Sequence, residues 1–518
     1  MTTQAGPSST ALPGPGEGRR DAPLAMRGDE FRRAGHQLVD AVASFLDSLP
    51  ERPLTRAESP EAVRAALGAS RPLPLEGADP SGLLDRAARL LFDHSLFNGH
   101  PRFFGYVTSS PAPIGMLADL LAAAVNPNVG AWRLSPMASE IEAQAVRWIA
   151  ELAGYPPDGG GLLVSGGNMA NFVGLLAARA AVPGRDVRRR GVSGTGRLRV
   201  YASTETHTWI HKAADLAGLG TDAIAWIPTD ADLRMDVTAL RSAIGRDRDA
   251  GDHPLLVVGT AGSVSTGAVD PLPEMAAACK ESGAWFHVDG AYGGFAALAH
   301  GAPADLRGLA LADSVALDPH KWLYAPLEAG CTLVRRADAL RDAFSYHPPY
   351  YHFGEEATNY LDLGPQNSRG FRALKVWLGL QHAGRAGCIR TIEDDMRLSR
   401  RLHARVEAHP ELEAFGQALS ISTFRFVPRD LRDRRNDGDV ASYLDTLNQE
   451  VLERVQNSGE AFVSNAVVGG RYLLRACIVN FHTDAADVDA LPEIAARLGR
   501  EADASLRGHA SFPSRTRA

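Results

Sequence analysis

Short apolar runs alternate with longer helical patterns between residues 161 and 334, and this alternation restricts the fold more than any other feature of the chain. A strand that returns to its sheet through a helix pairs in parallel with an earlier strand. The alternation therefore predicts an α/β fold with a mostly parallel seven-stranded sheet and helices on both faces. The predicted strands are Leu162–Val164, Leu198–Tyr201, Ala223–Ile227, Leu255–Gly259, Trp285–Val288, Ser314–Leu317 and Cys331–Val334.

Helical patterns lie on either side of this region. Apolar residues recur at three- and four-residue spacing over Phe31–Leu49, and a second amphipathic helix is predicted over Leu83–Phe92. A long helix after Arg369 leads into a small C-terminal α+β domain with strands at Ser422–Val427 and Tyr472–Val479. We predict a disordered tail over 1–26, an N-terminal helical segment over 27–112, a large domain over 113–382, a small domain over 383–506 and a disordered tail over 507–518.

Composition restricts the partners. A chain of 518 residues that is 45% hydrophobic can bury more than one core. Its net charge of -7 gives no electrostatic reason to bind nucleic acid or an anionic membrane. The four cysteines are far apart and form no CxxC pair, which argues against disulfides and structural zinc. No secretory signal or membrane-spanning run is apparent in the sequence. We therefore expect a cytoplasmic protein with a small-molecule substrate and no metal.

A lysine and an aspartate follow two successive predicted strands. Lys321 comes shortly after Ser314–Leu317 and directly before Trp322, where a desolvated amine can attack an aldehyde. Asp289 directly follows Trp285–Val288, and successive strand ends meet in one crevice of an open sheet. An imine-forming lysine and an aspartate that keeps a pyridine nitrogen protonated are what pyridoxal 5′-phosphate (PLP) requires, so the pair predicts a PLP enzyme. For Asp289, a structural role in capping a turn is the alternative.

Three further segments end at the same edge of the predicted sheet. The turn Ser165–Asn168 precedes a helical pattern, and amides at a helix N-terminus suit a phosphate, although an ordinary tight connection is the alternative. His207 follows a strand and would reach the crevice, although a histidine there is more often a surface or packing residue. Gly259–Ser263 supplies small hydroxyl residues or forms a bare turn.

Several motifs, in this order along the chain, resemble those of the group II PLP-dependent decarboxylases, the family of aromatic L-amino-acid, glutamate, histidine and 2,4-diaminobutyrate decarboxylases. The likeness spans about Phe31 to Leu498. It implies a fold-type I, aspartate-aminotransferase-like homodimer, with the N-terminal helical segment around the partner and the active site at the dimer interface. The matching segments are His100–Phe104, Ser135–Pro136, Glu140–Glu142, His287–Tyr292 (HVDGAY), Asp318–Trp322 (DPHKW), Phe371–Lys375 and Cys477–Asn480.

The resemblance also implies roles for single residues. Lys321 is the expected Schiff-base lysine, Asp289 the partner of the ring nitrogen, and Ala291 and His207 the residues on the two ring faces. Gly167, Asn168 and Asp318 match positions that help to hold the cofactor phosphate. Tyr350 matches a loop tyrosine that is thought to protonate the carbon left by CO₂. The predicted catalytic residues are Lys321, His207 and Tyr350, and the predicted cofactor-binding residues are Lys321, Asp289, Ala291, His207, Gly166, Gly167, Asn168, Asp318, His320 and Ser263.

The resulting hypothesis is PLP-dependent decarboxylation of an L-amino acid to its amine and CO₂, with an aromatic amino acid favoured. Tyr106, Phe104 and Trp132 supply aromatic surface that favours a flat side chain, although buried aromatics are more often core than pocket residues. Asn128 stands where aromatic-specific members of the family carry a bulky apolar group. Decarboxylation of an acidic or diamino acid, aldehyde formation and non-catalytic PLP binding remain alternatives; Tyr350 favours decarboxylation over aldehyde formation. The predicted substrate-binding residues are Tyr106, Ser109, Phe104, Asn128 and Trp132.

Overall fold

The computed structural model describes residues 22–509, apart from 194–195 and 347–356. These residues form two compact units. The smaller unit contains the residues up to 52 together with residues 58–95, and the larger unit contains residues 53–57 and those from 96 onward. Across the described ranges, every helix is too short or too polar to cross a bilayer. The domain boundaries expected from the sequence stay a prediction.

The smaller unit is helical. It contains α1 (Gly28–Ser48), α2 (Pro60–Leu67) and α3 (Pro80–His94). The side chains of Ser59 and Asp79 cap α2 and α3, and both of these helices begin with a proline. Phe45 and Phe92 stack with ring centroids 4.3 Å apart, so α1 and α3 pack along their apolar faces. The two helices predicted for this region are therefore present.

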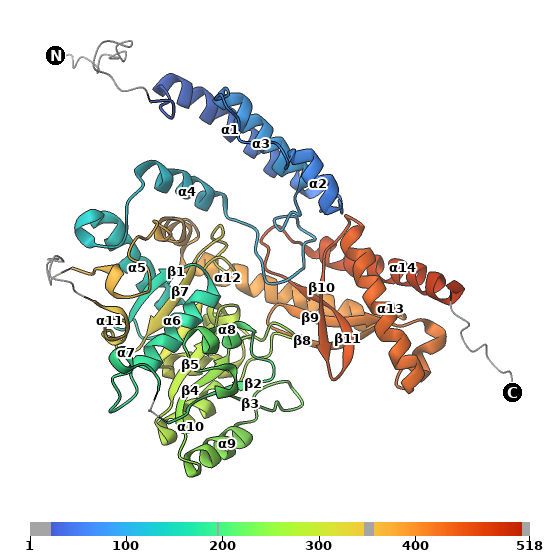
Figure 1. The fold of residues 1–518 in the computed structure, drawn as a ribbon. Coiled ribbons are helices and arrows are strands. Elements are labelled where there is room, and N and C mark those ends of the chain that lie inside the picture. The colour runs from blue at the N-terminus through green and yellow to red at the C-terminus, as the bar shows by residue number, and fades with distance from the viewer. Residues whose placement is uncertain (1–21, 194–195, 347–356, 510–518) are drawn as a thin grey trace, which may run out of the picture. The chain divides into compact units, whose positions relative to one another are not determined.

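The larger unit contains the seven-stranded sheet (Figure 1). Its strands are β1 (Gly160–Val164), β2 (Leu198–Ser203), β3 (Ile224–Ile227), β4 (His253–Thr260), β5 (Trp285–Asp289), β6 (Ser314–Leu317) and β7 (Gly330–Val334). They lie in the order β1-β7-β6-β5-β4-β2-β3. Pairing is parallel from β3 through β6, whereas β7 is antiparallel to both neighbours. The sequence did not predict this reversal. It arises because residues 318–329 form turns without a crossover helix that would restore the strand direction.

Helices cover both faces of this sheet, and alternate strand residues serve the two faces. Tyr201 and Val257 pack with α5 (Pro136–Leu152), α9 (Val237–Asp249) and α10 (Leu272–Ser282). Their neighbours Val200, Leu256 and Val258 pack instead with α6 (Gly167–Ala180) and α8 (Trp209–Leu216). The two-layer cover predicted from the alternating pattern is thus present.

A second, four-stranded antiparallel sheet follows in the order β10-β11-β9-β8. Its strands are β8 (Leu412–Ala418), β9 (Ile421–Phe426), β10 (Ser464–Val468) and β11 (Arg471–Cys477). The helix α12 (Ala373–Ala408) leads to it and is interrupted at Gly384; α13 (Gly438–Asn457) and α14 (Ala485–His509) complete the small core. The sequence predicted β9 and β11 but missed the edge strands β8 and β10. Both have mixed burial patterns, and the register of β8 also shifts between Ala414 and Gly416.

Shorter elements connect these layers. They are α4 (Pro113–Val125), α7 (Val187–Arg190) and α11 (Ala339–Phe344), with the 3₁₀ segments η1 (Leu49–Glu51), η2 (Trp132–Leu134), η3 (Thr221–Ala223), η4 (Gly293–Leu298), η5 (Ala304–Leu311), η6 (Tyr360–Asp362) and η7 (Arg429–Arg434).

Candidate active site

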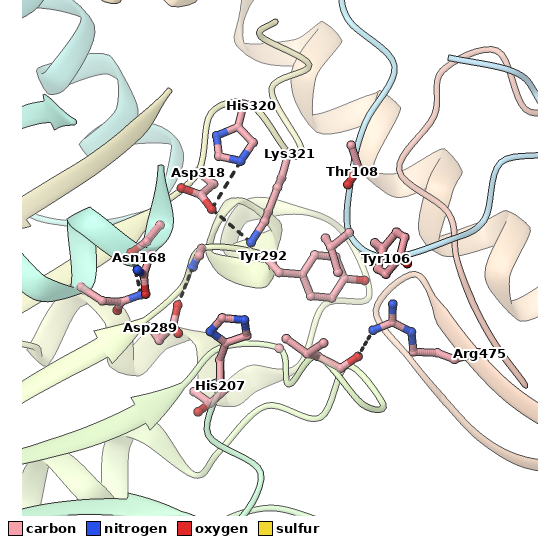
Figure 2. A pocket seen from close by; sticks show the side chains of 17 residues that line it. Tyr106, Thr108, Asn168, His207, Asp289, Tyr292, Asp318, His320, Lys321 and Arg475 are labelled. Carbon is pink, nitrogen blue, oxygen red and sulfur yellow. Dashed lines mark hydrogen bonds and ion pairs between the residues drawn. The ribbon is translucent and has the colours of Figure 1, made fainter. Parts of the chain in front are cut away.

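A cavity of about 350 Å³ lies beyond the carboxyl ends of β4, β5 and β6 (Figure 2). Ligands of open parallel sheets bind at this edge. The lining residues come from segments far apart in the chain: Tyr106, Val107, Thr108, Gly167, Asn168, Asn171, His207, Thr260, Gly262, Val264, Asp289, Ala291, Tyr292, Asp318, His320, Lys321 and Arg475. The structure thus brings Lys321, Asp289 and His207 to one cavity.

Lys321 lies in the turn that follows β6. Its backbone N–H donates to the Asp318 carbonyl at 2.9 Å, and its carbonyl accepts from the Tyr324 N–H at 3.1 Å. The side chain is mostly buried, and its Nζ lies 3.1 Å from Asp318 Oδ2. Figure 2 shows this amine within the cavity, directed at Asp318. The other carboxylate oxygen, Asp318 Oδ1, is buried without a hydrogen-bond partner among the described residues.

Asp289 is the last residue of β5 and is buried. Its Oδ1 accepts a hydrogen bond from the Ala291 N–H at 3.2 Å, as the turn-capping interpretation requires. The same residue also lines the cavity, as the cofactor interpretation requires. The two roles are therefore compatible, because the capping bond holds the carboxylate at the cavity wall.

His207 is held in a defined state. Its Nδ1 accepts the backbone N–H of Trp209 at 3.2 Å, which leaves Nε2 as the proton-bearing nitrogen of the neutral ring. The pKa of His207 lies below its usual value, mainly because burial disfavours the imidazolium. The Lys321 charge acts in the same direction, while Asp289 and Asp318 oppose it. His207 is therefore neutral at neutral pH.

The glycine turn before α6 forms one end of the cavity. Gly166 has φ +86°, a left-handed value that favours glycine. At Gly167 a Cβ would lie 2.5 Å from Asp318 Oδ2 and 3.1 Å from the Ala291 Cβ, so a larger residue does not fit. Asn168 follows in the first helical turn and lines the cavity. The first N–H groups of a helix lack acceptors within the helix, so the N-terminus of this 14-residue helix is suited to an anion.

Two other predicted cofactor residues differ in their placement. His320 lines the cavity, with its Nδ1 2.7 Å from the Ala329 carbonyl. Ser263 is buried and is not among the residues that line the cavity. Its Oγ lies 3.1 Å from Thr266 Oγ1. The predicted catalytic residue Tyr350 lies outside the described residues.

Of the predicted substrate-binding residues, only Tyr106 lines the cavity described here. Ser109 Oγ donates to the His320 carbonyl at 2.7 Å, and Phe104 is fully buried in the small-domain core. Asn128 Oδ1 accepts from the Gly130 and Arg369 amides, and Trp132 Nε1 donates to Glu140 at 2.8 Å. Within one chain, these four side chains are held by other contacts, so their substrate role stays a prediction.

Arg475 is a cavity residue that the sequence analysis missed. It lies in β11, is 2% exposed and donates from Nη1 to the Val264 carbonyl and from Nη2 to Ser464 Oγ. Its Nε is buried without a partner, and its charge has no carboxylate partner in the part of the chain that the structure describes. The sequence signal that could have identified Arg475 is its position inside the apolar run Tyr472–Val479, because an arginine is rarely buried without a role.

A hydrogen-bonded row behind the cavity joins the glycine-turn helix to the sheet. Asn171 Nδ2 donates to the Gly167 carbonyl at 2.9 Å, and Asn171 Oδ1 lies 2.8 Å from His287 Nε2. His287 Nδ1 lies 2.7 Å from Ser314 Oγ, which accepts from Trp285 Nε1. The amide orientation makes His287 Nε2 the donor, so a neutral ring with an accepting Nδ1 satisfies every group.

This row predicts a pH-dependent stability. Burial lowers the pKa of His287 to about 4, whereas an unfolded histidine takes up its proton near pH 6.5. Stability is therefore lost as the pH falls from 6.5 towards 4, by about 2 kcal/mol between pH 7 and pH 5. The free energy of unfolding of His287→Gln, measured with urea at pH 7 and pH 5, should lack this part of the pH-dependent loss. An exposed control, His36→Gln, should keep the wild-type difference, and an unchanged difference in His287→Gln contradicts the assignment.

Comparisons with known proteins agree with this geometry. The family model described as "Pyridoxal-dependent decarboxylase conserved domain" matches residues 75–424. An aromatic-L-amino-acid decarboxylase of Bacillus atrophaeus is 32% identical over 465 residues, which cover 89% of this chain and 93% of that protein. A phenylacetaldehyde synthase of a Rosa hybrid cultivar is 28% identical, covering 88% and 91%. The crystal structure of Oryza sativa TDC with PLP and tryptamine matches with a TM-score of 0.85 at 29% identity, covering 93% of this chain and 99% of that one.

Proposed function

The chain belongs to the pyridoxal-dependent decarboxylase family, and from this premise we propose that it converts an aromatic L-amino acid into the corresponding amine and CO₂. The observation that carries the proposal is the convergence of Lys321, Asp289 and His207 on one cavity. The aromatic preference is supported by the relatives, among them the decarboxylase of Bacillus atrophaeus and the rice structure with tryptamine.

The residues around the cavity fit PLP. The buried carboxylate of Asp289 suits the pyridine nitrogen, and Lys321 offers an amine for the aldehyde. The small side chain of Ala291 and the neutral ring of His207 suit the two ring faces, because neither brings an unpaired charge against an apolar surface. The amides of the glycine turn suit the phosphate. When bound, PLP supplies an electron-withdrawing ring that accepts the electrons left by CO₂.

Asp318 suits a phosphate less well than the resemblance implies. A carboxylate repels a phosphate at close range, whereas Asp318 already pairs with the Lys321 amine. We therefore assign Asp318 to holding that amine in the cavity before the cofactor binds. The glycine turn and Asn168 keep the phosphate role.

The remaining steps fall to side chains around the substrate. Orientation of the carboxylate by the cavity walls selects which bond of the substrate breaks. His207 keeps its proton on Nε2 and is neutral, so it is suited to packing on the ring and donating a hydrogen bond. We assign the return of a proton to the substrate carbon to Tyr350, by resemblance.

A second candidate substrate is an acidic amino acid, and Arg475 is the observation that favours it. This guanidinium lines the cavity without a carboxylate partner in the described ranges, and a buried cation is stabilised by an anionic ligand. With an aromatic substrate, the Arg475 guanidinium would keep only its two hydrogen bonds to the protein. The side-chain carboxylate of an acidic substrate would form an ion pair with it.

A substrate screen tests the proposal. We expect amine and CO₂ in equal amounts from aromatic L-amino acids, and little turnover of acidic or diamino acids. In Arg475→Met, turnover of aromatic substrates should persist while any activity on acidic substrates falls by roughly a hundredfold, the loss of one buried charge pair. Preferred turnover of an acidic substrate would replace the first candidate with the second, and aldehyde in place of amine would contradict both.

We also propose that the chain acts as a homodimer. Four apolar residues spaced along one side of α4, namely Leu117, Leu120, Leu121 and Val125, are each more than half exposed. Phe31, Val39, Leu83 and Leu91 of the smaller unit are exposed as well. A contiguous apolar helix face in water supports burial against a second copy.

Charges on this face should separate the subunits. Each aspartate buried without a partner costs about 3 kcal/mol, so Leu117→Asp with Leu121→Asp should weaken dimerisation by a hundredfold or more. Light scattering should report a dimer for the wild type and a monomer for the variant. Leu216 on α8 is 71% exposed, and Leu216→Asp is the matched control that should stay dimeric. A monomeric wild type contradicts the proposal.

We propose a cytoplasmic location because the cysteines form no disulfide bonds. Cys279, Cys331, Cys388 and Cys477 are all buried and unpaired, as is usual in a reducing compartment. Cell fractionation tests this location.

A further inference from the structure

Asp395, in the middle of α12, is a buried carboxylate that the proposed mechanism does not use. It is 2% exposed and has no lysine, arginine or histidine within ion-pair distance among the described residues. Its Oδ2 accepts from Trp322 Nε1 at 2.8 Å and from the Tyr324 hydroxyl at 2.5 Å. A buried carboxylate that lacks a cation must be held by such donors.

Both side-chain donors belong to the turn that carries Lys321. Trp322 directly follows Lys321, and Tyr324 donates its backbone N–H to the Lys321 carbonyl. Tyr324 has φ +54°, in the left-handed region that a residue with a large side chain adopts only under restraint. The bond from its hydroxyl to Asp395 supplies such a restraint, because it fixes the far end of the side chain.

Aromatic contacts extend this anchor to the cavity wall. The Trp322 ring stacks on Tyr292 with centroids 4.8 Å apart, and Tyr292 lines the cavity. The Tyr324 ring meets the Phe481 ring edge-on at 5.2 Å. The Asp395 carboxylate therefore joins α12 to the Lys321 turn, and the Tyr324 ring joins that turn to the segment after β11.

We propose that Asp395 is a positioning residue that holds the backbone of Lys321 and so keeps its amine in the cavity. Asp395 is not among the residues that line the cavity, so it acts only through Trp322 and Tyr324. This inference rests on the cofactor role proposed for Lys321.

Three variants and a control test it. Asp395→Leu removes both acceptor oxygens, Asp395→Asn removes the charge and replaces one acceptor oxygen with an NH2 donor, and Tyr324→Phe removes one donor. The neighbouring Asp394 is exposed and pairs with Arg397 on the same helix, so Asp394→Asn is the matched control. Each protein is freed of cofactor, titrated with PLP and followed by visible absorbance, and its melting temperature, kcat and KM are measured.

The Leu variant should bind PLP about tenfold more weakly and lose about tenfold in kcat, with KM little changed, as expected for the loss of a buried hydrogen bond. The Asn and Phe variants should shift in the same direction, with altered absorbance of bound PLP, and the Asp394 control should match the wild type. If the Leu variant does not fold, the Asn and Phe variants decide.

The proposal would be overturned if the Asn and Phe variants kept the PLP affinity, absorbance and kcat of the wild type and showed only a lower melting temperature. Asp395 would then contribute to fold stability alone. PLP bound to a residue other than Lys321 in the wild-type protein would overturn the cofactor role together with this inference. Borohydride reduction of the PLP-loaded wild type, followed by peptide mass spectrometry, distinguishes that case.

Discussion

Replacing Lys321 with alanine is expected to abolish both turnover and the visible absorbance of bound PLP. The amine is the only lysine nitrogen that the described residues place in the cavity, and Asp318 holds it there. Removing a group that forms a covalent bond to the cofactor should lower kcat on the order of a thousandfold or more. Absorbance spectra and CO₂ release measure the two effects.

The control for this variant is Lys280→Ala. Lys280 lies on α10 and lines a different hollow, next to Cys279 and Asp313. It should keep wild-type absorbance and turnover. Persistence of both signals in Lys321→Ala would remove Lys321 from the mechanism.

The second large effect is expected for Asp289→Asn. An amide has the shape of the carboxylate and can still accept the Ala291 N–H, but it cannot hold a proton on a pyridine nitrogen through opposite charge. Without that proton the ring withdraws electrons poorly, so kcat should fall by roughly a hundredfold to a thousandfold while the Lys321 absorbance persists. Steady-state kinetics with saturating PLP measure the change.

Asp313→Asn serves as the matched control for Asp289. Asp313 also accepts a backbone N–H, that of Phe286, but it precedes β6 at the opposite end of the sheet from the cavity. Its amide variant should retain wild-type kcat. Equal losses in the two variants would mean that the Asp289 effect is one of folding and not of chemistry.

The sequence predicted the parts of the fold that depend on local patterns. Strands β5 and β6 are short apolar runs. Asp289 ends β5 and Lys321 lies in the turn after β6, so the pattern predicted both residues at one edge of the sheet. The family match and the structural match confirm the predicted family, the mostly parallel α/β fold, the decarboxylase class and PLP as its cofactor.

Long-range contacts account for what the sequence missed. Arg475 reaches the cavity because β11 pairs with β9, and no local pattern near residue 475 records that pairing. The anchor at Asp395 likewise depends on Trp322, 73 residues away in the chain. Phe104, which was predicted as a substrate contact because of its aromatic ring, is buried in the small-domain core, and its substrate role stays a prediction.

The most direct test of the central claim is reduction of the PLP-loaded protein with borohydride, followed by digestion and peptide mass spectrometry. The reduction traps any lysine that is covalently bound to PLP. The account predicts a single modified peptide with the pyridoxyl mass on Lys321. A modified lysine elsewhere, or no modified peptide from a protein that has bound PLP, would contradict it.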